Sequence, residues 1–230
     1  KSIDQIIILD RGNKNKNGIH DGIIGSYSLA KELEKYNFDK IFIFNSSLRF
    51  NLIARFAGIK CIYQYPLFQK KNQHVIKAAR ELIKKTLNLE VTSDPKILVN
   101  NQLIQNAKIK YRIGNNEINI LLGIGGSGPT KRIPAKIFLE FMHLITKTQK
   151  CRFFLATGKN SEEQEILKEI LNSKFKKLCC ALDELDLIST LPIIKNCNIS
   201  ICNDSSFSHL SSGLGIKTIV LMADTPLLYG

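Results

Sequence analysis

The chain has 230 residues, of which 44% are hydrophobic and 23% charged, a composition typical of a globular protein and not of a disordered one. Its longest apolar runs, such as 6–9 and 118–124, have the length of strands, so we expect no bilayer-spanning helix and no signal peptide. With 33 basic against 20 acidic residues the formal net charge is +13, which favours anionic partners. Because the basic residues are spread out and not clustered with aromatics, we do not expect nucleic acid among them.

The cysteines and histidines do not follow the spacing of a metal site. None of the six cysteines forms a C-x-x-C pair, and the four histidines are scattered along the chain. We therefore expect free thiols in a reducing cytoplasm and no bound metal.

Short β-rich runs alternate with helical patterns from the start of the chain, which is typical of a parallel α/β fold. The first run, Ile6–Asp10, predicts a buried strand. The expected elements of the first half then follow as helix 27–36, strand 40–44, helix 47–56, strand 59–63 and helix 75–87.

Periodicity is lost between residues 89 and 117, so we place a domain boundary after residue 115. A second series follows, with strands predicted at 118–122, 152–156, 198–202 and 217–222 and helices at 135–147, 162–171, 187–195 and 208–213. We predict an α/β protein of two Rossmann-like domains, 1–115 and 116–230, with parallel sheets facing a cleft. Compared with a complete Rossmann-like domain, the first half begins with what looks like the second βα unit, and the last residues have the composition of a loop. We therefore expect a fragment that lacks the first βα unit and the C-terminal end.

The first candidate motif is the glycine-rich stretch Gly123–Arg132, between a predicted strand and a predicted helix. Glycines let backbone N–H groups approach an anion, and Lys131 and Arg132 add positive charge, so the stretch indicates diphosphate binding. The G-x-G-x-x-G spacing is by itself weak evidence, and a tight turn with solvated charges is the alternative interpretation. No acidic residue ends the next strand to hold a ribose, which disfavours a dinucleotide site.

The second candidate motif is Asn203–Leu210, which follows strand 198–202. Asp204 stands at the carboxyl end of that strand, Ser205 and Ser206 can donate to a phosphate or a sugar, and His209 lies on the first turn of the next helix. The alternative is that Asp204 caps the helix and His209 is an ordinary surface residue. Because both motifs follow strands of one parallel sheet, we expect them to face one crevice and bind a nucleotide-diphosphate-sugar.

Several segments resemble glycosyltransferase family 9, the heptosyltransferases of lipopolysaccharide core synthesis. The likeness lies in GGSGPTKRIPAKIFLEF at 125–141, FFLATG at 153–158 and NDSSFSHLSSGLGIKTIVLMADTP at 203–226, and residues 38–60 resemble the family's acceptor half. The resemblance implies a GT-B fold, with the acceptor on the N-terminal domain and the nucleotide-sugar donor on the C-terminal domain.

The resemblance also implies roles for particular residues. Lys131 falls on the family's phosphate-binding lysine, and Asp204, Ser205 and His209 fall on its donor-binding aspartate, its neighbouring hydroxyl residue and its motif histidine. The expected donor-binding set is Gly126, Ser127, Lys131, Asn160, Asp204, Ser205, Ser206 and His209.

This chain departs from the family's pattern in three places. Ser206 replaces the usual glycine, and Asn160 stands where many members have an acidic residue. The family's catalytic base, an aspartate in a Gly-Asp motif after the first strand, has no counterpart, because Asp10 and Asp21 do not match it. We therefore name no catalytic residue.

We expect an inverting, metal-independent transfer of a heptose-like sugar from an ADP-sugar to an anionic glycolipid of the lipopolysaccharide-core type. The enzyme would be cytoplasmic, with peripheral contact to the inner membrane as a further possibility. The alternatives are a non-catalytic nucleotide- or sugar-binding module and a dinucleotide-dependent oxidoreductase. Arg49 and Arg55 are interpreted as a solvated face, with an anionic acceptor as their alternative partner, and residues 183–186 as a solvated loop. The acidic residues at 162–165 are explained by the charge preference of the first turn of a helix.

Overall fold

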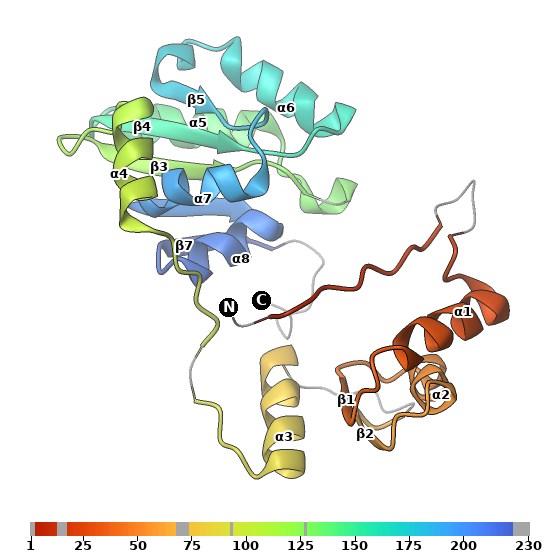
Figure 1. The fold of residues 1–230 in the computed structure, drawn as a ribbon. Helices are drawn as coiled ribbons and strands as arrows, with labels where there is room; N and C mark the ends of the chain where they lie inside the picture. Colours follow the sequence, from red (N-terminus) through yellow and green to blue (C-terminus); the bar gives the residue numbers. More distant parts are fainter. Residues whose placement is uncertain (1–2, 13–17, 68–73, 93, 127, 223–230) are drawn as a thin grey trace. The chain divides into compact units, whose positions relative to one another are not determined.

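The structure is a computed structural model that describes residues 3–12, 18–67, 74–92, 94–126 and 128–222. The chain separates into two compact units, residues 1–92 and 93–230. Each unit contains its own parallel sheet with helices packed on it (Figure 1).

The first unit is a small α/β assembly. Its elements are α1 (Gly22–Glu34), β1 (Lys40–Ile43), α2 (Leu48–Phe56), β2 (Cys61–Gln64) and α3 (Val75–Leu87). Strands β1 and β2 pair in parallel, and buried residues of α1 and α2, among them Leu29 and Ile53, pack on Ile43 of β1. The helices and strands predicted for residues 27–87 are therefore confirmed, with shifts of a few residues at their ends.

The predicted buried strand at Ile6–Asp10 is wrong. The segment has no strand assignment, and the side chains of Ile6 and Ile8 are 74% and 80% exposed. Four consecutive apolar residues suit a buried strand, but such a strand also needs a hydrogen-bonded neighbour, and no pairing to the described part of the first unit exists for this segment.

The second unit is built on a five-stranded parallel sheet. Its strands are β3 (Ile118–Gly123), β4 (Cys151–Ala156), β5 (Cys179–Ala181), β6 (Ile199–Asn203) and β7 (Lys217–Leu221). Their order in the sheet is β5-β4-β3-β6-β7. The chain thus builds outward from β3 to β5 and then returns to the other side of β3, which is the strand order of a doubly wound Rossmann sheet.

Helices cover both faces of this sheet. They are α4 (Asn101–Lys110), α5 (Ala135–Ile145), α6 (Ser161–Leu171), α7 (Leu187–Lys195) and α8 (Ser206–Gly213), with short 3₁₀ turns at Pro129–Lys131 and Lys176–Leu178. On one face Ile120 and Phe153 pack with α5 and α6, while on the other Leu121 and Phe154 pack with α4 and α7 (Figure 1). Alternate residues of each central strand therefore point into opposite halves of the core.

The division between the units lies before the boundary expected after residue 115, because residues 101–110 form helix α4. Ala107 of α4 and Ile113 after it belong to the buried cluster of the second unit. The side chain of Asn196, at the end of α7, donates to the Ile104 carbonyl at 2.9 Å. These contacts attach α4 to the second unit.

No helix in the described part of the chain combines the length and the apolar character that crossing a bilayer requires.

Candidate functional site

The candidate site lies where the strand order of the second sheet reverses. Strands β3 and β6 are hydrogen-bonded neighbours, with Gly123 opposite Cys202, although the chain visits β4 and β5 between them. The loops after β3 and β6 therefore diverge on opposite sides of the sheet and leave a crevice at its carboxyl edge. Ligands of open α/β sheets bind at this topological switch point.

An ion pair joins the loops after β3 and β6. Lys131 Nζ lies 2.6 Å from Asp204 Oδ2, and the two side chains are 29% and 12% exposed. The expectation that the glycine-rich turn and the Asp204 segment lie close together is therefore confirmed. The pair sets a cation and a carboxylate side by side at the switch point.

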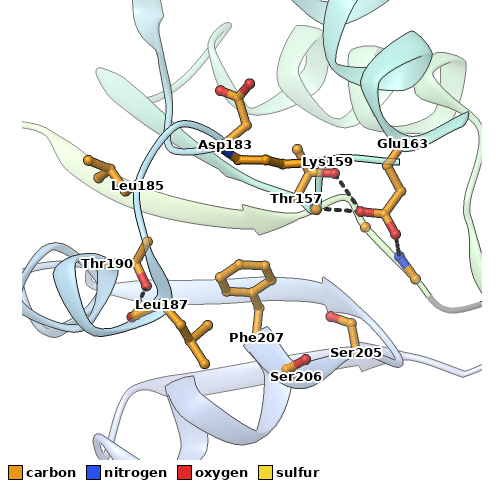
Figure 2. A pocket seen from close by; sticks show the side chains of 13 residues that line it. Thr157, Lys159, Glu163, Asp183, Leu185, Leu187, Thr190, Ser205, Ser206 and Phe207 are labelled. Carbon is orange, nitrogen blue, oxygen red and sulfur yellow. Dashed lines mark hydrogen bonds between the residues drawn. The ribbon is translucent and has the colours of Figure 1, made fainter. Parts of the chain in front are cut away.

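Glu163 holds the glycine-rich loop against the loop after β4. The residue is only 6% exposed, and its carboxylate accepts hydrogen bonds from Gly126 N at 3.1 Å, from Thr157 Oγ1 at 2.9 Å and from Gly158 N (Figure 2). Burial alone would raise the pKa of Glu163, but donors from Gly158, Asn160, Gly126 and Thr157 outweigh it and leave the pKa below its usual value. The residue is thus an ionised, buried clamp.

Arg132 braces the same loop from its other side. Its guanidinium donates to the Gly126 carbonyl at 3.1 Å and also pairs with Glu162. Arg132 is therefore engaged in holding the loop, whereas Lys131 extends to the switch point.

A pocket of about 430 Å³ opens beside the ion pair. Its walls come from the segments that follow β3, β4, β5 and β6, and Figure 2 shows Thr157 and Glu163 on one side and Leu187 and Phe207 on another. The volume falls within the range of small-molecule sites, which is about 300–1,000 Å³.

Two buried polar atoms between the end of β6 and the start of α8 are unpaired within the described part of the chain. Among the described residues, Ser205 Oγ and Asn203 Oδ1 have no hydrogen-bond partner. Asn203 Nδ2 nevertheless donates to the Ile124 carbonyl at 2.9 Å and so ties β6 to the glycine-rich loop. Buried polar atoms are usually satisfied, so an unsatisfied hydroxyl on the wall of a pocket points to a polar ligand or water there.

The structure brings most of the predicted donor-binding residues together. Gly126, Ser205 and Ser206 line the pocket, and Lys131 and Asp204 meet beside it. Ser127 lies outside the described residues.

Asn160 and His209 are placed differently. The Asn160 side chain caps α6 by accepting from Glu163 N at 2.9 Å, and neither Asn160 nor His209 is part of the described pocket wall. His209 is exposed one turn into α8. For both residues, contact with a donor stays a prediction.

Sequence reasoning missed Glu163 and the wall that follows β5. Glu163 was attributed to the charge preference of a helix start, and residues 183–186 to a solvated loop, yet Glu163, Asp183 and Leu185 line the pocket. Asn160 followed three residues later by Glu163 is the pattern of a capping box, which was a usable signal for a carboxylate at this position. Phe207 carried no such signal.

In the first unit, the charged residues near the proposed acceptor side make internal contacts. Asp21 accepts from the N–H groups of Gly12 at 2.6 Å and Gly18 at 2.9 Å, and these hydrogen bonds lower its pKa to about 2. Arg49 donates to Ser26 Oγ at 2.9 Å and to the His20 carbonyl. Arg55 donates to Asn51. The two arginines interpreted as a solvated face therefore also hydrogen-bond within the unit.

No group of three or more histidine, cysteine, aspartate or glutamate side chains is arranged to hold a metal ion among the residues described. The positive charge described at the switch point comes from Lys131.

The fold and the site define the second unit as a Rossmann-type domain with a ligand pocket at its switch point. The model of glycosyltransferase family 9 (heptosyltransferase) matches residues 26–228, and the chain belongs to this family. The resemblance stated from the sequence motifs is thereby confirmed.

Three relatives illustrate the similarity. Lipooligosaccharide heptosyltransferase 2 of Campylobacter jejuni is 26% identical over 205 residues, which are 86% of this chain and 61% of the relative. The structure of E. coli ADP-heptose lps heptosyltransferase II is 18% identical with a TM-score of 0.68, covering 89% of this chain and 68% of that one. E. coli heptosyltransferase WaaC with ADP-2-deoxy-2-fluoro heptose is 16% identical with a TM-score of 0.63, covering 89% and 67%.

The two solved structures establish the fold and confirm the predicted GT-B-like α/β class with parallel sheets. The chain spans 61% of the length of the Campylobacter relative.

Proposed function

We propose that this protein is a glycosyltransferase that transfers a heptose-type sugar from an ADP-sugar to an acceptor of the lipopolysaccharide-core type. Membership of the heptosyltransferase family supports the class of reaction. The donor is taken from the E. coli relative, whose structure contains an ADP-heptose analogue. The lipooligosaccharide named for the Campylobacter relative supports the acceptor.

The observation that carries the proposal is the 2.6 Å contact between Lys131 and Asp204 at the switch point. A diphosphate placed between the glycine-rich loop and α8 meets the Lys131 ammonium on one side and the N-terminus of α8 on the other. Ser205 Oγ supplies a hydroxyl on the same wall. Asp204 is placed to accept hydrogen bonds from hydroxyl groups of the attached sugar.

The proposed reaction is a displacement with inversion. An acceptor hydroxyl attacks the anomeric carbon, the bond from that carbon to the diphosphate oxygen breaks, and the diphosphate leaves with the bonding electron pair. The acceptor proton passes to a general base, for which we assign no residue. Lys131 and the loop N–H groups stabilise the charge that develops on the leaving diphosphate, without a metal ion.

We place the acceptor with the first unit, as the family resemblance implies, and the reaction in the cytoplasm at the inner membrane surface. An anionic glycolipid suits a chain with a formal net charge of +13. Contact with the membrane is part of the proposal.

Isothermal titration of the chain with ADP and with ADP-heptose tests the donor half of the proposal. We expect both to bind, and Lys131→Ala to weaken both by at least about tenfold, because charge-assisted contacts to phosphate are lost. Lys136→Ala is the matched control, since Lys136 lies on α5 of the same unit with a side chain 79% exposed. Failure of ADP to bind, or equal effects of the two substitutions, would contradict the proposal.

Transfer itself is tested with the same variants. Purified acceptor lacking heptose is incubated with ADP-heptose, and the mass of the glycolipid product and release of ADP are followed. We expect the mass of the glycolipid to increase by one heptose, and the rate of this transfer to be lower in the Lys131→Ala variant. If ADP-heptose binds but neither transfer nor hydrolysis occurs, the non-catalytic binding module becomes the better description.

A further inference from the structure

The pocket of the second unit has two chemically different ends. Gly125, Gly126, Ser205 and Ser206 present backbone and hydroxyl groups beside the Lys131–Asp204 pair. Away from the ion pair, the wall is formed by Leu185, Leu187 and Phe207 together with the methyl-bearing side chain of Thr190. Lys159, Glu163 and Asp183 also line the pocket. A ligand with an anionic group at one end and a flat, largely apolar group at the other would complement both ends.

Phe207 is the aromatic residue in the described wall of this pocket. Figure 2 shows its ring projecting from the start of α8 into the space between Leu187 and Thr157. The residue is half-buried and packs on the buried cluster that contains Leu182, Ile193 and Ile194. One side of the ring therefore packs on the core, while another part of it lines the pocket.

We propose that Phe207 is the stacking platform for the nucleobase of the donor and determines how strongly this site prefers a purine. The proposal rests on the proposed function and deepens it, because it assigns the apolar end of the same pocket to the base. Stacking on an aromatic ring accepts any base, since every base has a π-face, but a purine covers more of the ring than a pyrimidine does. Selectivity for adenine over uracil then comes from contact area on Phe207.

The position of Phe207 in the chain supports this assignment. Ser205 occupies the N-cap position of α8 without a side-chain capping bond, and Ser206 is the first residue of the helix. Phe207 therefore follows directly after the groups assigned to the diphosphate. A base on the ring and a diphosphate on the serine and glycine loops therefore belong to one continuous ligand. The same short segment both receives the anion and holds the base.

The test compares Phe207→Leu, which retains apolar volume without a ring, and Phe207→Trp, which enlarges the ring. Affinities for ADP, UDP and inorganic pyrophosphate are measured by titration calorimetry on the whole chain. We expect Phe207→Leu to lower the affinity for ADP by about 10- to 100-fold and the affinity for UDP by less, so that the preference for ADP over UDP is reduced. The affinity for pyrophosphate should change by no more than about twofold. Phe207→Trp is expected to bind ADP at least as tightly as the unsubstituted chain.

Phe141→Leu is the matched control. Phe141 is another half-buried phenylalanine of the second unit, but it lies on α5 and packs edge-on against Phe153 in the other half of the core. Its substitution should leave the affinity for ADP unchanged. The unfolding temperature of every variant is measured in parallel.

A spectroscopic measurement on the unsubstituted chain keeps the proposal testable if Phe207→Leu does not fold. Stacking places the adenine H2 and H8 protons over the phenyl ring, so their bound-state NMR resonances should shift upfield, and Phe207→Trp should change the size of that shift. Bound ADP with no upfield shift would overturn the proposal.

The outcomes separate this inference from the function on which it rests. If ADP does not bind the unsubstituted chain, the proposed function fails. If ADP binds in a Lys131-dependent manner and Phe207→Leu leaves it unchanged, only the role of Phe207 is overturned. Equal losses of ADP and pyrophosphate affinity would also overturn it, because Phe207 would then merely support the anion-binding loop.

Discussion

Lys131 Nζ and Asp204 Oδ2 lie 2.6 Å apart, although 73 residues separate them in the chain. In the free protein each of these groups thus partly neutralises the charge of the other, whereas we assign Lys131 to the phosphates of the donor and Asp204 to its sugar. A ligand that engages only one of the two must compete with the other.

The pair predicts opposite effects of one substitution on two ligands. Asp204→Asn leaves the shape of the side chain but removes its charge, so Lys131 is released for an anion. We expect affinity for inorganic pyrophosphate to rise about two- to tenfold, and affinity for ADP-heptose relative to ADP to fall, because the sugar loses a charged acceptor. Titration calorimetry measures both. A loss of pyrophosphate affinity would show instead that Asp204 positions Lys131.

Glu163→Gln should destabilise the second unit at neutral pH. The substitution replaces an ionised carboxylate, which accepts three hydrogen bonds from the loops after β3 and β4, with a neutral amide that accepts fewer. We expect a loss of about 1–3 kcal/mol in the free energy of unfolding, measured by denaturant titration. Glu165→Gln, on the exposed side of the same helix, should change it by less than about 0.5 kcal/mol.

The stabilisation by Glu163 should also depend on pH. Its pKa in the folded chain lies below the ordinary value of 4.5, so the unfolded chain takes up the proton first as the pH falls. The stabilisation is complete above that ordinary value and is lost as the pH falls through the folded pKa. Denaturation curves at several acidic pH values should therefore show the unsubstituted chain and Glu163→Gln converging below pH 4.5. A difference in unfolding free energy that stays constant with pH would contradict the stabilising role of the ionised Glu163 carboxylate.

Gly125→Ala should deform the pocket where Gly128→Ala does not. A Cβ at Gly125 would lie 2.6 Å from Glu163 Oε2, whereas a Cβ at Gly128 has nothing within 4 Å. Because the Glu163 carboxylate is buried and hydrogen-bonded, we expect Gly125→Ala to lower the free energy of unfolding by about 1–3 kcal/mol and the affinity for ADP by at least about tenfold. Thermal unfolding and titration on the two variants check this. Equal stability and equal ADP affinity of the two variants would indicate that the glycine-rich loop can shift at little energetic cost.

The position of α4 predicts which fragment folds alone. Residues 93–230 include α4, whose Ala107 completes the buried cluster with Ile193 and Ile194, whereas residues 116–230 lack it. We expect cooperative thermal unfolding and ADP binding for the longer fragment, and exposed apolar surface with dye binding for the shorter one. Cooperative unfolding of the shorter fragment would place the boundary at 115/116.

Much of the second unit could be predicted because its strands and helices carry strong periodic signals. Because the loops that follow parallel strands meet at the carboxyl edge of the sheet, Lys131 and Asp204 could be predicted to lie close together without knowledge of the strand order. Helix α4 was missed because its sequence, NQLIQNAKIK, is largely polar and buries only Ala107 among its residues. Strand β5 was missed because it has only three residues, Cys179–Ala181.

The residues missed at the site have a different explanation. The role of Glu163 depends on loops that lie 37 and 5 residues before it in the chain. The capping-box spacing from Asn160 marks Glu163 locally, but it does not show that the carboxylate holds these two loops together. Phe207 looks like a core residue in the sequence, and only the crossing of α7 over the sheet places Leu187 near it. For Ile6–Asp10, composition alone predicted burial, but burial of a strand is a property of its neighbours.

The late arrival of β6 has a consequence for synthesis of the protein. Until residues 203–207 have left the ribosomal exit tunnel, Lys131 lacks its carboxylate partner and the pocket lacks the wall that Ser205, Ser206 and Phe207 form. The proposed ADP-sugar donor would therefore stabilise only those molecules in which this last part has inserted beside β3 and completed the sheet.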